Sequence, residues 1–136
     1  MNVIAFIQAR MSSKRLPNKV LLPLMGKTIL EHIFERLEHC KTLNKIVIAT
    51  SEDDTDKSIV DLCREKKMNY YKGSLNDVLD RYYQAAISYN ADVIVRITGD
   101  CPVIDPKVVD EVVSNYFDND YDLYTLSGDF PDGLDC

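Results

Sequence analysis

Short runs of apolar residues alternate along the chain with stretches in which apolar residues recur every three or four positions. The runs predict five strands, at residues 3–9, 45–50, 68–73, 92–97 and 121–126. The stretches between and after them predict four helices, at residues 28–39, 51–67, 76–89 and 106–117. Helices and strands in this alternation are typical of an α/β domain, with a mostly parallel sheet and helices on both faces.

Polar residues at the ends of these stretches support the helices. Thr28 and Glu31 have the T-x-x-E spacing of a capping box, in which each side chain hydrogen-bonds the backbone of the other residue. Pro106 suits the first turn of the last helix, and we expect Asp105 to be the N-cap before it. The spacing on the third helix predicts an apolar side made of Leu79, Tyr82, Tyr83, Ala86 and Ile87.

The composition fits one globular domain over residues 1–136. The chain is 46% hydrophobic and 28% charged, which allows a substantial core. A net charge of −6 and a pI of about 4.8 argue against a general nucleic-acid-binding surface. No apolar stretch is long enough to span a membrane, and the N-terminus does not resemble a signal peptide. The cysteines form no zinc-ligand pattern, so we expect Cys40 and Cys63 to be small buried groups in a reduced, cytoplasmic protein.

The charge is unevenly distributed. Residues 118–136 contain six aspartates and no base, whereas residues 1–27 contain no acid. The bases in this N-terminal part are Arg10, Lys14, Arg15, Lys19 and Lys27. A local cationic patch on an acidic protein indicates a small anionic ligand rather than a long polyanion.

Four of these bases follow the first predicted strand, and ligands of open parallel sheets bind at the carboxyl ends of the strands. Arginine offers a planar fork to phosphate oxygens and lysine a mobile point charge, while Ser12 and Ser13 add hydroxyl donors. This set suits a triphosphate. We expect Arg10 and Lys19 to contact it, and Lys14 to be a solvated surface charge.

Asp100, in the sequence TGDCP, is the second candidate because it follows the strand at residues 92–97. Magnesium in nucleotide sites takes one or two carboxylates together with phosphates and water, so Asp100 is a candidate metal ligand. A P-loop is disfavoured, because Leu21 stands where the Walker spacing before Gly26-Lys27-Thr28 requires glycine. We therefore expect that tripeptide to form a turn and a helix N-terminus.

The segment IQARMSSKRLPNKVLLPLMGKTIL resembles the N-terminal motif of the cytidylyltransferases that include CMP-sialic acid and CMP-Kdo synthetases. The matching positions are Arg10, Ser13, Arg15, Pro17, Lys19 and Gly26. Gln8 and the later segment RITGDCPVIDP look most like the spore-coat polysaccharide branch. Some members have Gly-Gly where this chain has Met11-Ser12.

The resemblance implies a nucleotide-diphospho-sugar transferase fold, an αβα sandwich with a mixed sheet. It implies an enzyme that uses CTP to activate an acidic sugar as a CMP-sugar, with release of pyrophosphate. It places Asp100 on Mg²⁺, Asp80 and Arg81 near the base and the sugar, and around the CTP the residues Ala9, Arg10, Ser12, Ser13, Arg15 and Lys19. Family members form homodimers and continue well past 136 residues, so we expect this chain to be a fragment of a longer one.

Two other functions stay open. A glycosyltransferase of the related fold would need a D-x-D motif after a strand, and Asp118–Asp120 has that form but precedes the predicted strand at residues 121–126. A non-catalytic nucleotide-binding module would have the same basic segment without turnover. A plain α/β domain with an exposed basic loop is the least specific interpretation.

Overall fold

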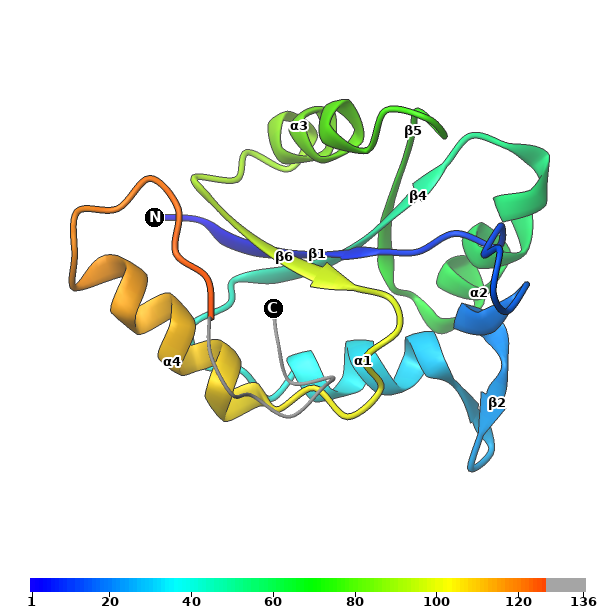
Figure 1. The fold of residues 1–136 in the computed structure, drawn as a ribbon, viewed down its shortest axis with the longest axis horizontal. Coiled ribbons are helices and arrows are strands. Elements are labelled where there is room, and N and C mark those ends of the chain that lie inside the picture. The colour runs from blue at the N-terminus through cyan, green and yellow to red at the C-terminus, as the bar shows by residue number, and fades with distance from the viewer. Residues whose placement is uncertain (127–136) are drawn as a thin grey trace.

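The computed structural model describes residues 1–126, and the loop expected at residues 127–136 lies outside them. Four parallel strands form the central sheet in the order β5-β4-β1-β6 (Figure 1). Their bounds are β1 Val3–Gln8, β4 Lys45–Ser51, β5 Asn69–Gly73 and β6 Val93–Thr98. The helices are α1 Ile29–Leu37, α2 Lys57–Lys66, α3 Val78–Ser88 and α4 Pro106–Phe117, with short 3₁₀ turns η1 Lys19–Leu21 and η2 Asp54–Asp56. Strands β2 Pro23–Leu24 and β3 Lys27–Thr28 form a small antiparallel hairpin.

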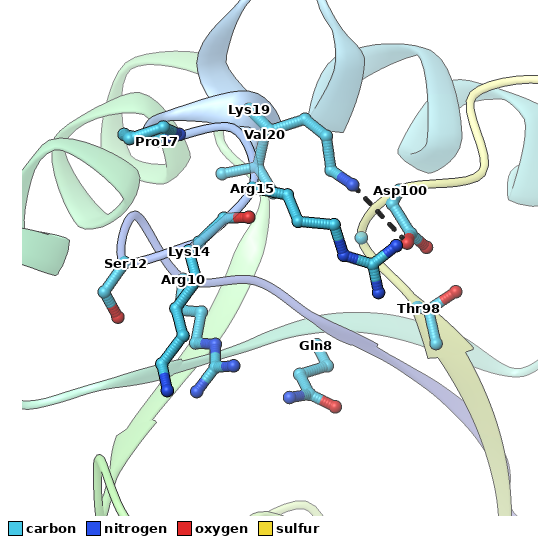
Figure 2. Close-up of a pocket in the computed structure, with 12 residues that line it drawn as sticks. Gln8, Arg10, Ser12, Lys14, Arg15, Pro17, Lys19, Val20, Thr98 and Asp100 are labelled. Carbon is cyan, nitrogen blue, oxygen red and sulfur yellow. Dashed lines mark ion pairs between the residues drawn. The ribbon is translucent and has the colours of Figure 1, made fainter.

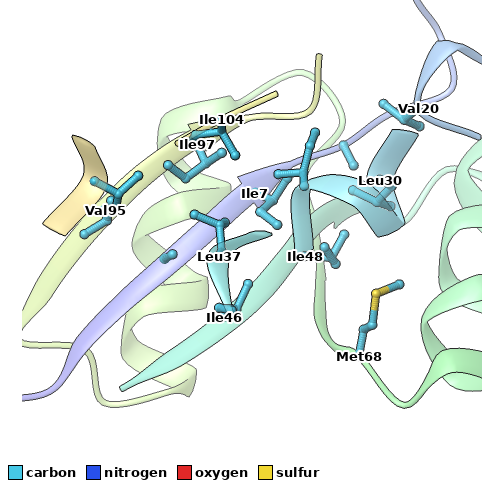
Figure 3. Packing of buried hydrophobic residues seen from close by; sticks show 14 of the residues in the cluster. Ile7, Val20, Leu30, Leu37, Ile46, Ile48, Met68, Val95, Ile97 and Ile104 are labelled. Atoms are coloured by element: carbon cyan, nitrogen blue, oxygen red, sulfur yellow. The ribbon is translucent and has the colours of Figure 1, made fainter. Parts of the chain in front are cut away.

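The sheet lies between two helical layers, as the alternation of apolar runs predicts. One face packs against α1, α2 and α4 in a cluster that includes Ile7, Ile48 and Leu30 (Figure 3). The other face packs against α3, where Phe6 meets the ring of Tyr82 edge-on. Burial on both faces explains why β1 and β4 are nearly continuous apolar runs. The fold is therefore the predicted αβα sandwich.

The helix ends follow the local signals in the sequence. Thr28 and Glu31 form both hydrogen bonds of the capping box at the start of α1. Asp105 caps α4, and Pro106 occupies its first turn. The turn between β2 and β3 uses Gly26 at φ 84°, in the left-handed region that favours glycine, so the tripeptide that begins there is a turn and a helix start.

The buried face of α3 differs from the expectation. Tyr82 and Ala86 are buried, but Leu79, Tyr83 and Ile87 point outward and are more than half exposed. The buried side instead includes Arg81 and Ala85. The spacing alone predicts the wrong face because two apolar stripes run along this helix. The stripe that packs against the sheet includes the charged residue Arg81.

The strand predicted at residues 121–126 is absent from the described part of the chain. These residues are irregular, with a bend at Asp122 and no strand partner, and the side chain of Leu123 is 81% exposed. Alternation of apolar and polar residues marks a strand only where a neighbouring strand completes its hydrogen bonds.

The structure also bears on two expectations drawn from the composition, the burial of the cysteines and the absence of a membrane-spanning segment. Cys63 is buried on α2 as expected, and burial raises the pKa of its thiol to about 12, whereas Cys40 is only partly buried. No helix within residues 1–126 has the length and apolar character needed to cross a membrane.

The strand order places a topological switch point between β1 and β6. From β1 the chain adds β4 and then β5 on one side, and it later returns to add β6 on the other side. The connections that leave β1 and β6 therefore run to different parts of the fold and open a crevice between them, where ligands of open α/β sheets bind. Gln8 and Thr98 are paired neighbours at this point.

Candidate functional site

A cavity of about 810 Å³ opens at this switch point. Its volume is in the range of pockets that hold small organic ligands. The basic segment after β1 and the residues that end β6 both contribute to its wall (Figure 2). The lining residues are Gln8, Arg10, Ser12, Ser13, Lys14, Arg15, Pro17, Lys19, Val20, Thr98, Gly99 and Asp100.

The basic segment is a compact loop held by its own backbone. The amides of Ser13 and Asn18 both donate to the carbonyl oxygen of Met11, each at 3.0 Å, so the loop closes on itself. Asn18 has φ 62°, a left-handed conformation that asparagine tolerates, and it turns the chain into η1. Lys19 stands at the start of this turn. The loop thereby brings its four cations back toward the end of β1, where they line the cavity.

Asp56 anchors this loop to the rest of the domain. Its Oδ1 accepts the backbone N–H of Met11 at 2.7 Å, and its Oδ2 accepts the hydroxyl of Ser51. Asp56 is completely buried. The side chain of Met11 packs against the core cluster and does not line the cavity, so of the two residues that replace Gly-Gly only Ser12 faces it.

Asp100 lies across the cavity from the loop, as Figure 2 shows, and its Oδ2 is 3.6 Å from Nζ of Lys19. Hydrogen bonding with Thr98 lowers the pKa of the Asp100 carboxyl, burial opposes this, and the charge of Lys19 lowers it further. The side chains of Lys19 and Asp100 are 34% and 50% exposed. An ion pair this exposed adds roughly 0–1 kcal/mol to folding stability, so stability alone does not explain the arrangement.

Gly99 allows β6 to approach β1 closely at the base of the cavity. A Cβ at Gly99 would lie 2.4 Å from the carbonyl oxygen of Gln8, a contact that real Cβ atoms do not make, and 3.3 Å from Val20. A backbone oxygen inside a paired strand cannot move aside as a flexible side chain can. Any larger residue at this position must therefore displace the turn that bears Asp100.

Most of the predicted site residues meet at this cavity. Arg10, Ser12, Ser13, Arg15, Lys19 and Asp100 all line it. Ala9 does not, because its side chain is buried in the core and its amide pairs with the carbonyl of Ala49. Asp80 is an exposed residue in the first turn of α3 that accepts a hydrogen bond from Gln84. Their contact with a ligand stays a prediction.

Arg81 is not among the lining residues either, yet it is the largest fully buried side chain within residues 1–126. Its Nη1 donates to the carbonyl of Ser74 at 2.8 Å, while its Nε and Nη2 have no hydrogen-bond partner. Burial lowers the pKa of the guanidinium, and the nearby positive charge of Arg10 adds to this while Asp56 opposes it. Buried donors without partners are rare and costly in folded proteins.

Other residues that line the cavity were not predicted as ligand contacts, among them Lys14, Gln8 and Thr98. Lys14 is exposed, as expected of a solvated surface charge, and it also lines the cavity with the other loop cations. The sequence alone gives Gln8 and Thr98 no role in a site, because polar residues are common at strand ends. The signal that finds them is their pairing across the switch point, which requires knowing that β6 lies next to β1.

No cluster of three or more metal-binding side chains exists among residues 1–126. Asp100 is the carboxylate that lines the cavity, and it faces the cationic loop. A single carboxylate is a sufficient protein ligand for magnesium only where substrate phosphates and water supply the other oxygens. The donor set therefore fits a metal that arrives with a nucleotide rather than one held by the protein alone.

The comparisons with known proteins agree with this geometry. A family model described as cytidylyltransferase matches residues 4–131. The chain belongs to the cytidylyltransferase family. Spore coat polysaccharide biosynthesis protein SpsF of Bacillus subtilis is 37% identical to it over 139 residues, which cover 98% of this chain and 58% of SpsF. The 3-deoxy-manno-octulosonate cytidylyltransferase of Pelobacter propionicus is 30% identical over 122 residues, which cover 88% of this chain and 46% of that enzyme.

The fold of the family is confirmed at the level of coordinates. The structure of a cytidylyltransferase from Leptospira borgpetersenii matches with a TM-score of 0.91 and 39% identity, covering 99% of this chain and 58% of that one. These relatives confirm the resemblance seen in the loop motif and the nucleotide-diphospho-sugar transferase fold. The chain spans about half the length of the curated relatives it matches.

Proposed function

We propose that this chain forms the nucleotide-binding part of an enzyme that transfers CMP from CTP to a hydroxyl group of an acidic sugar. The observation that supports the proposal is the cavity at the switch point, where an acid-free cationic loop faces Asp100. The named cytidylyltransferases among the relatives support cytosine as the base. The SpsF relative supports a role in surface polysaccharide synthesis. A homodimer of the whole protein and a cytoplasmic location stay predictions.

The reaction is a displacement at the α-phosphorus of CTP. The sugar hydroxyl oxygen forms a bond to that phosphorus, the bond to the oxygen bridging to the β-phosphate breaks, and pyrophosphate leaves with its electron pair. The hydroxyl proton passes to solvent, because the residues within 1–126 that line the cavity include no histidine and no carboxylate besides Asp100. The contribution of the protein is position and charge, which supply most of the rate in phosphoryl-type transfers.

Within this reaction, Arg10, Arg15 and Lys19 neutralise the triphosphate and the departing pyrophosphate. The guanidinium groups offer paired donors to phosphate oxygens, and Lys19 follows the charge as a flexible ammonium. Ser12 and Ser13 add hydroxyl donors at the cavity wall. Asp100 would hold Mg²⁺ together with phosphate oxygens, and the metal would supply further neutralisation of charge on the phosphates.

Ala9, Asp80 and Arg81 do not line the cavity, so the geometry gives their roles in this proposal less support. Arg81 is completely buried, so its support for the proposal is indirect: its charge interacts with that of Arg10, which lines the cavity. Ala9 precedes the loop, and because its amide pairs with Ala49, its carbonyl oxygen is the backbone group left to contact a nucleotide. Asp80 shares the first turn of α3 with Asp77, which caps that helix.

The test compares Lys19→Ala with Lys27→Ala. Lys27 is an exposed lysine outside the cavity that pairs with Glu35, so it controls for loss of a surface charge. Titration calorimetry with Mg·CTP should show a drop in affinity of about tenfold or more for Lys19→Ala and no change for Lys27→Ala. Pyrophosphate release with a panel of sugar acids measures turnover, where we expect a loss of roughly 100-fold for Lys19→Ala.

Each result has a clear meaning. Equal CTP affinity in both variants would refute the proposed site. CTP binding without pyrophosphate release for any sugar acid would favour the nucleotide-binding module. The glycosyltransferase alternative has little support, because Asp118–Asp120 follow α4, are exposed and do not line the cavity.

A further inference from the structure

Beside the cavity, one face of β6 is exposed and is not covered by any helix within residues 1–126. On the side of the sheet that faces α3, β6 presents Ile94, Arg96 and Thr98, because alternate residues of a strand point to the same face. All three are exposed, whereas the intervening Val95 and Ile97 are buried against the opposite layer. Figure 1 shows α3 lying above the sheet, and its main contacts are with β4 and β5. The uncovered face of β6 therefore leads directly away from Thr98 in the cavity wall.

Arg96 is the charged group on this face. Its guanidinium lies 5.5 Å from the centre of the Tyr82 ring, and Tyr82 is itself buried against Phe6. Stacking on a fixed ring restricts the guanidinium and leaves its positive charge without a counterion. No carboxylate within residues 1–126 forms an ion pair with Arg96. Arg96 is thus an exposed cation whose position is restricted by stacking. It lies about 7 Å along the strand from Thr98.

The other cations of the site are in a different place. Arg10, Lys14, Arg15 and Lys19 all belong to the loop that follows β1, whereas Arg96 belongs to β6. In a displacement at phosphorus, the attacking and leaving oxygens lie roughly in line on opposite sides. If the loop holds the departing pyrophosphate, the attacking sugar must come from the side away from the loop. The exposed face of β6 meets the cavity at Thr98, on the strand beside β1 and not in the loop.

We propose that Arg96 binds the carboxylate of the acidic sugar and so selects sugar acids over neutral sugars. This inference rests on the proposed function. It adds a second anion site, on the sheet face, to the phosphate site in the loop. A guanidinium suits this role because its planar fork matches a carboxylate with two parallel hydrogen bonds.

The chain contains a closely matched control. Arg64 on α2 also lies over a tyrosine, with its guanidinium 5.9 Å from the ring centre of Tyr70, and it is exposed. It also hydrogen-bonds the hydroxyl of Tyr70 near the start of β5, and it does not line the cavity. Arg96→Gln and Arg64→Gln each remove one stacked, exposed arginine and therefore change the net charge equally.

The experiment measures sugar binding to the chain loaded with a non-hydrolysable CTP analogue. The probes are 3-deoxy-manno-octulosonate, N-acetylneuraminate and a hexuronate, each beside its methyl ester. The wild-type chain should bind at least one acid about tenfold or more tightly than its ester. Arg96→Gln should abolish that preference, Arg64→Gln should keep it, and all three proteins should bind the CTP analogue equally within about twofold.

Three outcomes would overturn the inference. Wild-type chain that binds the CTP analogue but prefers no acid to its ester would refute it, and so would a preference retained in Arg96→Gln. A loss of analogue affinity in Arg96→Gln as large as in Lys19→Ala would assign Arg96 to phosphate instead. Failure of the wild-type chain to bind the analogue at all would instead refute the proposed function.

Discussion

Polar side chains have different roles at the two ends of the central sheet. At the amino end, side chains satisfy the backbone: Asn2 and Asp92 tie the start of β1 to the start of β6, and Asn44 accepts the amide of Val3 at 2.8 Å. At the carboxyl end, Arg10 and Arg15 face a cavity and form no ion pair within residues 1–126.

The contrast distinguishes polar groups that stabilise the fold from polar groups that are available to bind a ligand. A hydrogen-bonded polar side chain at a strand end contributes to stability and has no further capacity. Unpaired cations gathered in one cavity repel each other, and an anion relieves that repulsion. Asp56 shows that the carboxyl end also contains structural polar groups, and these anchor the loop from behind.

The largest effect on this contrast should come from Gly99→Ala. The added Cβ would meet the carbonyl oxygen of Gln8 at 2.4 Å, so the turn that bears Asp100 must shift from its position beside Lys19. Overpacking of this kind costs roughly 1–3 kcal/mol of folding free energy. We expect CTP affinity to fall by more than about tenfold while the protein stays folded, measured by calorimetry beside circular dichroism. Unchanged affinity would mean that the position of Asp100 does not matter.

Asp56→Asn should have the next largest effect. The amide can still accept one hydrogen bond, but the buried negative charge beside Arg81 disappears. We expect a loss of roughly 1–3 kcal/mol in the free energy of unfolding, from urea titration, and a fall of several-fold in CTP affinity. Asp54→Asn, an exposed neighbour in η2, is the control and should change neither. A loss of stability without a loss of affinity would restrict Asp56 to folding.

Much of the fold follows from the sequence because its signals are local. The strand cores, the capping box at Thr28 and the cap at Asp105 depend on residues within one turn of each other. The failures depend on distant partners. Residues 121–126 have the alternation of a strand but no neighbour, and Leu79 lies on a stripe of α3 that nothing within residues 1–126 covers.

The residues of the site also fall into two groups, those that local signals in the sequence predict and those that depend on distant partners. The loop cations and Asp100 can be recognised because residues after parallel strands meet at one edge of the sheet. Gln8 and Thr98 become visible only once β6 is known to pair with β1, and Arg96 only once its face of β6 is known to be uncovered. Asp56 lies 45 residues from Met11, and no local pattern indicates that its carboxylate would turn back to that amide.

The smallest effect should appear at the amino end of the sheet, with Asp110→Ala. The carboxylate of Asp110 accepts the amide of Lys41 at 3.0 Å, and both the amide and the hydroxyl of Thr42, in the loop that leads into β4. Burial alone would raise the pKa of Asp110, but these hydrogen bonds outweigh it and hold the pKa below its usual value. The stabilisation is therefore complete above the unfolded pKa of about 4, and it is lost as the pH falls through the lower pKa of the folded state.

Urea unfolding of Asp110→Ala should show a loss of roughly 1–2 kcal/mol at pH 7, and this difference from wild type should shrink below about pH 4. CTP affinity at pH 7 should be unchanged, because the hydrogen bonds at this end serve only the fold. A variant that lost affinity in proportion to stability would show that the two ends are coupled. The cations of the loop would then owe their position to the whole sheet, and the separation of structural from ligand-binding polar groups would fail.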